Sequence, residues 1–172
     1  MTAQATSAVA EATSGVATSD LGGKYLTFKL AGEEYGLEIL KVREIVKIMD
    51  ITTVPKMPGF IKGVVNLRGK VIPVIDLRLR FDLPEAEYNE ETCIIVVNVG
   101  TETGVVVDTV QEVLDITDEA IEPPPAFGSQ VDTKFILGMG KVGDAVKILL
   151  DIDRVMSGEE RAELASFADQ SA

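Results

Sequence analysis

Short runs in which apolar and polar residues alternate fill most of this chain, and they predict strands. Lys24–Leu30 alternates with a period of two, and Ala31–Glu34 supplies a turn. The β-branched runs Ile61–Leu67 and Val71–Ile75 meet at Arg68-Gly69-Lys70, which predicts a hairpin. Further strands are predicted in the second half at Cys93–Val99, Val105–Val107, Phe135–Met139 and Val146–Leu150. Short helices are predicted at Ile39–Ile48, Leu77–Phe81 and Ile152–Phe167.

The two halves of the chain repeat one pattern. An offset of 68 residues aligns Gly32 with Gly100, Gly36 with Gly104, Val42 with Val110 and Ile45 with Val113. An offset of 75 aligns Phe60 with Phe135, Gly63 with Gly138, Val71 with Val146 and Asp76 with Asp151. This predicts an internal duplication of two β-rich units of about 60 to 70 residues. Because a unit of that size has a marginal core, we expect the two units to share a hydrophobic seam.

The predicted fold class is all-β with short helices, in two small antiparallel barrels. We expect a first barrel at about 23–81, a linker at 82–91 and a second barrel at about 92–156. Residues 1–22, almost all Ala, Thr, Ser, Val and Gly, are predicted to be a disordered tail, and 157–172 a C-terminal helix or tail.

Composition excludes several classes of function. The chain has no histidine, which removes His-based acid–base catalysis, Ser-His-Asp and Cys-His nucleophiles and most zinc sites. Its single cysteine, Cys93, lies in an apolar run, forms no internal disulfide and suits a reducing compartment. The first residues lack the pattern of a secretory signal, and no apolar run approaches the roughly 18 residues of a membrane span. We therefore expect a cytoplasmic protein without membrane insertion.

The net charge of −12 disfavours nucleic acid and anionic membranes as partners. The charge is unevenly distributed along the chain. Residues 24–81 hold eleven Lys/Arg and six Asp/Glu, whereas residues 82–172 hold five and twenty. This asymmetry leaves two interpretations open: electrostatic steering of partners, or chance surface composition.

Two motifs that resemble catalytic or cofactor sites are interpreted as structural. Gly138–Gly143 has the letters of a dinucleotide fingerprint, but that fingerprint requires a following helix, and a strand is predicted instead. Asp76 and Asp151 could suggest acid–base or metal chemistry. Each precedes a predicted helix, so we expect N-caps. No cofactor or metal is expected.

In the stretch Leu40–Met49, which overlaps the predicted helix at Ile39–Ile48, the residues Val42, Ile45 and Met49 share one helical face. Such a stripe is either core or an exposed patch that binds a partner. Arg68 is different, because its counterpart in the second unit is Gly143 and the duplication does not require an arginine there. Arginine at a hairpin tip is either a solvated turn residue or an interface residue with several directed hydrogen bonds.

Three stretches together carry a family resemblance: Glu34–Ile45, Phe60–Gly69 with its Asn-Leu-Arg-Gly tip, and Val71–Leu77 with its Ile-Pro-Val-Ile-Asp-Leu run. They resemble the CheW family, the coupling proteins of bacterial chemotaxis arrays. The similarity runs from about Lys24 to Met156. The resemblance implies two SH3-like five-stranded barrels. It also implies a non-catalytic adaptor that joins methyl-accepting chemoreceptors to the histidine kinase CheA, whose regulatory domain is a homologous double barrel.

By position, the resemblance implies a receptor-facing set of residues along the groove between the barrels. These are Val42, Glu44, Gly63, Asn66 and Arg68, with Val110 and Val113 from the second barrel. For the kinase interface, the candidates are Cys93 and Phe127. The protein is expected to be a monomer in isolation and to assemble with its partners into rings or arrays at the inner face of the membrane.

Two other classes of function remain open from the residues alone. One is a regulatory double barrel that senses a small molecule in a related two-component pathway, which would show a sizeable cavity. The other is an enzyme that uses Lys or carboxylates, which would show a pocket of perturbed titratable groups.

Overall fold

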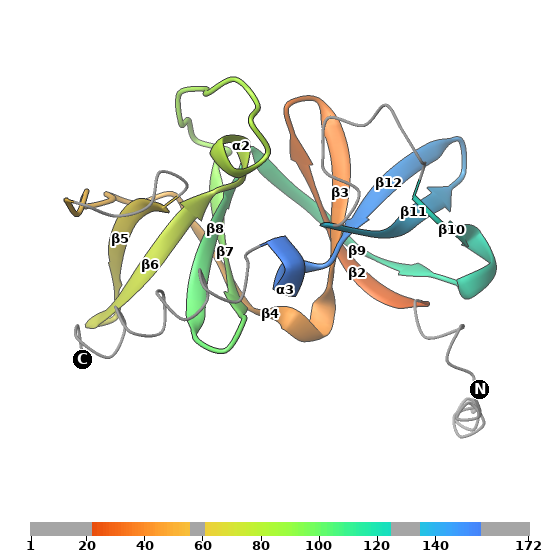
Figure 1. Cartoon of the computed structure of the whole chain (residues 1–172), viewed down its shortest axis with the longest axis horizontal. Helices are drawn as coiled ribbons and strands as arrows, with labels where there is room; N and C mark the ends of the chain where they lie inside the picture. The colour runs from red at the N-terminus through yellow and green to blue at the C-terminus, as the bar shows by residue number, and fades with distance from the viewer. Residues whose placement is uncertain (1–21, 56–60, 125–134, 156–172) are drawn as a thin grey trace.

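The computed structural model describes residues 22–55, 61–124 and 135–155, and within them the strands form two sheets that lie side by side (Figure 1). One sheet contains, in spatial order, β10 (Ile121–Glu122), β11 (Ile136–Val142), β12 (Ala145–Leu150), β3 (Glu33–Glu38), β2 (Gly23–Leu30) and β9 (Thr109–Ile116). The other contains β4 (Val42–Lys47), β7 (Cys93–Asn98), β8 (Glu102–Val107), β6 (Lys70–Asp76) and β5 (Ile61–Leu67). The short helices are η2 (Ile39–Lys41), α2 (Leu77–Arg80), η3 (Asp118–Ala120) and α3 (Ile152–Val155).

The predicted all-β fold of two duplicated subdomains is confirmed. Each unit runs through a hairpin, a third strand, a second hairpin and a short helix in the same order. The six-stranded sheet exceeds the predicted five strands by the two-residue strand β10.

The predicted barrel boundaries at 23–81 and 92–156 are wrong, because each unit gives its first hairpin to the other sheet. Strands β2 and β3 lie between β9 and β12, and strands β7 and β8 lie between β4 and β6. Each exchanged hairpin is held by a parallel pairing, β3 with β12 and β8 with β6. The halves of the chain therefore do not correspond to the subdomains, and the charge count of each half is not the charge of one sheet.

Both sheets close into barrels in the same way. Beyond β4, Thr52 pairs with Val64 of β5, and the nitrogen-to-oxygen distance is 2.8 Å in both hydrogen bonds. Beyond β9, the chain passes through η3 into β10, which pairs with β11. In each case the strand at one end of the sheet continues to the strand at the other end.

The predicted helix at Ile39–Ile48 is wrong. Only the 3-10 turn η2 is helical there, and the β-branched residues that follow form β4, which pairs with β7. Exposure alternates strictly along β4, as expected for a strand. The helices predicted at Leu77–Phe81 and Ile152–Phe167 start at the predicted residues. The second is described only as far as Val155. Of the predicted tails at 1–22 and 157–172, only Gly22 lies within the described residues.

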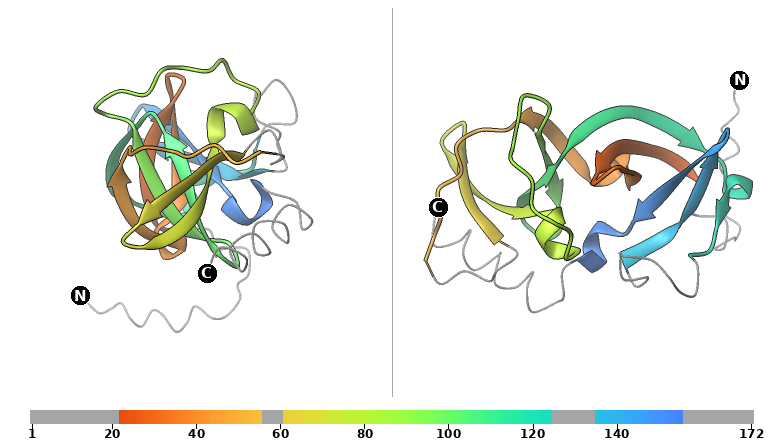
Figure 2. Two further views of the ribbon diagram at one scale, coloured as in Figure 1. Left: turned by 90° about the vertical axis from the view of Figure 1, so that its left-hand side faces the viewer. Right: turned by 90° about the horizontal axis from the view of Figure 1, so that it is seen from above.

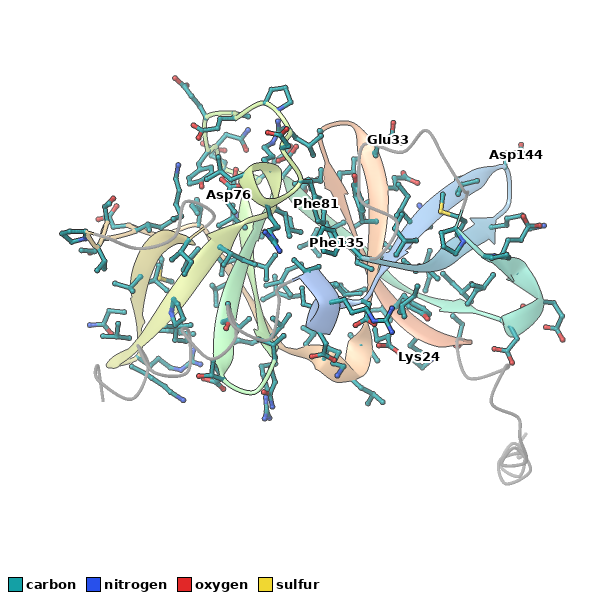
Figure 3. All side chains as sticks on the ribbon, viewed as in Figure 1. Lys24, Glu33, Asp76, Phe81, Phe135 and Asp144 are labelled. Carbon is teal, nitrogen blue, oxygen red and sulfur yellow. The ribbon has the colours of Figure 1, made fainter. Side chains whose placement is uncertain are left out.

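The expected hydrophobic seam joins the two sheets. Four buried aromatic rings stack in a row across it: Phe28, Tyr35, Phe81 and Phe135, with centroids 5.7, 6.2 and 5.7 Å apart. Figure 3 shows Phe81 and Phe135 together at the centre of the molecule, between the two sheets. Burial raises the pKa of Tyr35 to about 12, so its ring stays neutral. Each such ring pair contributes about 0.5 to 1.5 kcal/mol beyond its buried area.

Candidate functional site

The β5–β6 hairpin ends in a tight turn whose two central residues, Arg68 and Gly69, have φ of 55° and 86°. Two positive φ values identify a type I′ turn, which matches the twist of a hairpin. The Asn66 side chain supports the turn, since its Oδ1 accepts the Gly69 N–H at 2.8 Å. The left-handed conformation costs a non-glycine residue about 1 to 2 kcal/mol. In the other subdomain the position of Arg68 is filled by Gly143, at φ of 60°.

The Arg68 side chain reaches from the hairpin tip to β4, where its Nη2 donates to Glu44 Oε2. The structure thus brings together two of the residues predicted to face a receptor. Arg68 keeps 67% of its side chain exposed and Glu44 keeps 31%. The hydrogen bond to Glu44 raises the pKa of Arg68 above its usual value. Because an exposed ion pair of this kind is worth little for stability, its main effect is to orient the guanidinium.

Strand β4 also presents apolar side chains toward the seam. Val42 lies opposite Val97 and Ile45 opposite Ile95, and both partners belong to the seam core. Residues directly opposite each other in antiparallel strands point to the same face, so Val42 and Ile45 point to the seam side of their sheet. A register shift between Val42 and Glu44 allows Glu44 to lie opposite Val96 of the barrel interior instead.

Strand β9 repeats this arrangement in the second subdomain. Val110 lies opposite Phe28 and Val113 opposite Leu26, again in the seam core. Val42 and Val110 are half-buried, whereas 42% of Ile45 and 48% of Val113 is exposed. Seen from above, β4 and β9 run along the same long side of the molecule (Figure 2, right). Val42, Ile45, Val110 and Val113 are called the apolar strip below.

The remaining predicted residues are less accessible. Gly63 is buried, and the backbone of Thr52 packs so closely against it that there is no room for a side chain. Its glycine is thus explained by the closure of the barrel. Cys93 is half-buried in β7 and packs against the seam core, and its Sγ lies 3.4 Å from the Glu91 carbonyl oxygen. Its role toward a kinase stays a prediction. Phe127 lies outside the described residues.

Ion pairs anchor the starts of both candidate strands. Asp108, just before β9, accepts from Arg78 Nε at 3.0 Å and Nη2 at 2.6 Å and from the Ala31 N–H at 2.9 Å. Lys41, just before β4, donates to Asp153 Oδ2 at 2.6 Å. Arg78 and Asp153 are equivalent residues of α2 and α3, so the duplicated units keep the contact with reversed charges. These pairs fix where β4 and β9 leave the seam.

Replacing Asp108, whose side chain is one-third exposed, by Asn should lower the free energy of unfolding at pH 7 by about 1 to 2 kcal/mol, the lower part of the range for hydrogen bonds to a charged group. Burial alone would raise the pKa of Asp108, but the bonds from Arg78 and Ala31 outweigh it and lower the pKa below its usual value. A depressed folded pKa stabilises the protein above the unfolded value and loses that effect as pH falls through the folded value. The difference between wild type and Asp108→Asn in urea unfolding should therefore shrink from pH 5 to pH 2.5. A difference that is constant with pH would contradict this.

The motifs interpreted as structural have the predicted roles. Asp76 Oδ1 accepts the Arg78 N–H at 2.9 Å, and Asp151 Oδ1 accepts the Asp153 N–H at 3.1 Å, which confirms both N-caps. Asp76 also accepts from the Tyr88 hydroxyl at 2.8 Å, which fastens the linker to α2. Gly138–Gly143 forms a strand and the hairpin turn before β12, as predicted, and no helix follows.

A pocket of about 250 Å³ lies between the linker, α2 and the β2–β3 turn. The charged residues that line it are already paired: Asp76 accepts from the Arg78 N–H and the Tyr88 hydroxyl, and the Arg78 guanidinium donates to Asp108. Among the described residues, no helix is long and apolar enough to cross a bilayer.

A chain with two interlocked barrels, a displayed arginine and an apolar strip on their shared side has the architecture of a scaffold that binds other proteins. Residues 24–160 match the CheW-like domain family. The chain is 43% identical over 154 residues to the chemotaxis protein CheW of Klebsiella aerogenes, covering 89% of this chain and 93% of that protein. It is 33% identical over 157 residues to the CheW of Treponema pallidum, covering 88% and 92%.

The crystal structure of the scaffolding protein CheW from Thermoanaerobacter tengcongensis superimposes with a TM-score of 0.74 at 40% identity, covering 81% of this chain and 96% of that one. This chain belongs to the CheW family. It is a scaffold protein of chemotaxis and not an enzyme.

The receptor-facing set implied by the resemblance leaves out Ile45, which the sequence analysis places only in a stripe that is either core or a partner-binding patch. The 68-residue offset aligns Ile45 with Val113, which is in that set. That equivalence was the signal that could have placed both residues in one strip.

Proposed function

We propose that this chain couples methyl-accepting chemoreceptors to the histidine kinase CheA. The observation that carries the proposal concerns Arg68. It occupies a left-handed turn position that favours glycine, and the equivalent residue of the second unit is Gly143. Its side chain is exposed and pairs with Glu44. Arg68 is held in an unfavourable backbone conformation and does not contribute to the core. A contact between Arg68 and another protein would explain why an arginine stands at this position.

In this proposal the helical tip of a receptor lies along the apolar strip. Val42, Ile45, Val110 and Val113 supply apolar area, and the Arg68 guanidinium fixes the register through directed hydrogen bonds. Glu44 holds Arg68 in place, and Asn66 holds the turn that displays it. The apolar residues of two edge strands, β4 and β9, suit an elongated partner better than a compact one.

The kinase would bind elsewhere, through its regulatory domain and barrel to barrel. Edge strands and the outer surface of the sheets provide backbone groups and apolar side chains for such a contact. Cys93 and Phe127 remain the candidates for that interface. The protein would act in the cytoplasm, at the inner face of the membrane where receptors hold it. It would be a monomer in isolation and join rings or arrays with its partners.

Co-sedimentation with CheA and a receptor cytoplasmic fragment tests the proposal. We expect a ternary complex in which CheA autophosphorylates faster than CheA alone. The chain without receptor should still bind CheA, because the two surfaces are separate. Failure to bind either partner at tens of micromolar protein would contradict coupling.

A further inference from the structure

Leu40 is the most exposed large hydrophobic side chain among the described residues. In η2, 93% of its surface is accessible, whereas Ile45, Val113 and Val146, the next in order, reach at most 48%. A single exposed leucine is common on protein surfaces and would by itself need no explanation. Its position in the duplicated fold is what makes it informative.

The 68-residue offset makes Leu40 the counterpart of Asp108. In the second unit this position makes the ion pair with Arg78 that anchors β9. In the first unit the equivalent anchoring pair is made by the next residue, Lys41, with Asp153. The anchor has therefore moved by one residue, and Leu40 is left pointing to solvent without a role in the junction.

Leu40 lies close to the proposed receptor surface. Glu44 is four residues further along the chain, so the two Cα atoms are at most about 14 Å apart. The turn η2 and the tips of the β5–β6 and β7–β8 hairpins all lie along the lower edge of the molecule in Figure 1. Beside Leu40 is a hollow of about 140 Å³ lined by Gly22, Gly23, Lys24, Tyr25, Glu38 and Ile39. A protruding leucine next to a hollow is a shape that can interlock with a ridge of side chains.

We propose that Leu40 is an apolar anchor for the same helical receptor tip, extending the surface formed by the apolar strip and Arg68. This inference rests on the proposed coupling function. A span of up to about 14 Å corresponds to roughly two and a half turns of an α-helix. The partner is thus a helix with a polar or acidic group that meets Arg68, where it pairs with Glu44, and an apolar residue that meets Leu40 within about three turns of that group. The spacing would fix the position of the helix along its axis, which a single contact cannot do.

The test compares Leu40→Ser, Leu40→Met and Val146→Ser in the full chain. Binding to a receptor cytoplasmic fragment and to CheA is measured separately. Leu40→Ser should weaken receptor binding about 10- to 100-fold, the value of one buried leucine, with CheA binding unchanged. Leu40→Met should restore receptor binding to within a few-fold, because the requirement is apolar. Val146→Ser, which also removes an exposed apolar side chain but on β12, should leave receptor binding and CheA binding unchanged. All three variants should have melting temperatures close to that of wild type.

Equal receptor binding by wild type and Leu40→Ser would overturn the inference while leaving the coupling function intact. Loss of CheA binding with intact receptor binding would also overturn it, by assigning Leu40 to the kinase. If wild type itself does not bind the receptor fragment, the proposed function fails and this inference fails with it.

Discussion

Arg68→Glu is expected to weaken receptor binding by about 30-fold or more, with a melting temperature close to that of wild type. Charge reversal removes the directed hydrogen bonds of an interface arginine, and such residues often carry 2 kcal/mol or more of binding energy. Most of the side chain is exposed, so the fold loses only a weak surface ion pair with Glu44. Binding is measured by titration of a labelled receptor fragment and stability by thermal unfolding.

Arg68→Gly sharpens the same test, because it separates function from architecture. Glycine adopts the φ of 55° without strain, and the second subdomain already uses Gly143 in the equivalent turn. The free energy of unfolding of this variant, measured with urea, should equal that of wild type or exceed it by up to about 1 kcal/mol. The variant should still lose receptor binding. A gain in stability with a loss of binding is difficult to explain by misfolding.

Lys70→Glu is the matched control on the same hairpin. Lys70 has similar exposure to Arg68 and also pairs with a glutamate, Glu102, at 3.0 Å. If this variant loses receptor binding as fully as Arg68→Glu, the effect is one of general charge and the assignment of Arg68 is wrong. If Arg68→Gly binds the receptor like wild type, the arginine is a turn residue only.

The hairpins and the duplication could be predicted from the sequence because both are local. Period-two alternation and turn residues define β2–β3 and β5–β6, and the repeat aligns glycines that sit in the same turns. The exchange of the first hairpins could not be predicted. Alternation shows that a strand has a buried face, but it does not show which sheet the strand joins.

The error at Ile39–Ile48 has a different cause. Val42, Ile45 and Met49 fit a helical spacing, but Val42, Ile45 and Val46 are β-branched and pair along β7. The short segment fits a helical period and a strand period about equally well. Its pairing with β7 in the folded protein therefore determines that it is a strand. By contrast, the family resemblance puts Arg68 and Glu44 in one receptor-facing set, but the ion pair between them appears only when β4 and the hairpin tip are placed in space.

Gly63→Ala is expected to destabilise the protein by about 3 kcal/mol or more, because an added Cβ meets a closer contact here than at any other described glycine. A Cβ at this position would lie 2.2 Å from the Thr52 carbonyl oxygen and 2.8 Å from Ile51 Cγ2, on a backbone with φ of 154°. The clash falls on the pairing of Thr52 with Val64 that closes the five-stranded barrel. Urea unfolding followed by circular dichroism measures the loss.

Gly69→Ala and Gly138→Ala define what this result means. Gly69 has φ of 86° with no atom within 4 Å of an added Cβ, so its variant should lose only about 1 kcal/mol of backbone strain. Gly138 is the duplicate of Gly63, and its Cβ would lie 2.9 Å from the Glu122 carbonyl oxygen where β10 closes the other barrel, so its variant should be destabilised as well. If both Gly63→Ala and Gly138→Ala are destabilised, weak receptor binding by Gly63→Ala is explained by distortion of the barrel that contains β4, and not by the loss of a direct contact. If Gly63→Ala instead melts like wild type and loses only the receptor, Gly63 is a contact residue, as the family resemblance implied.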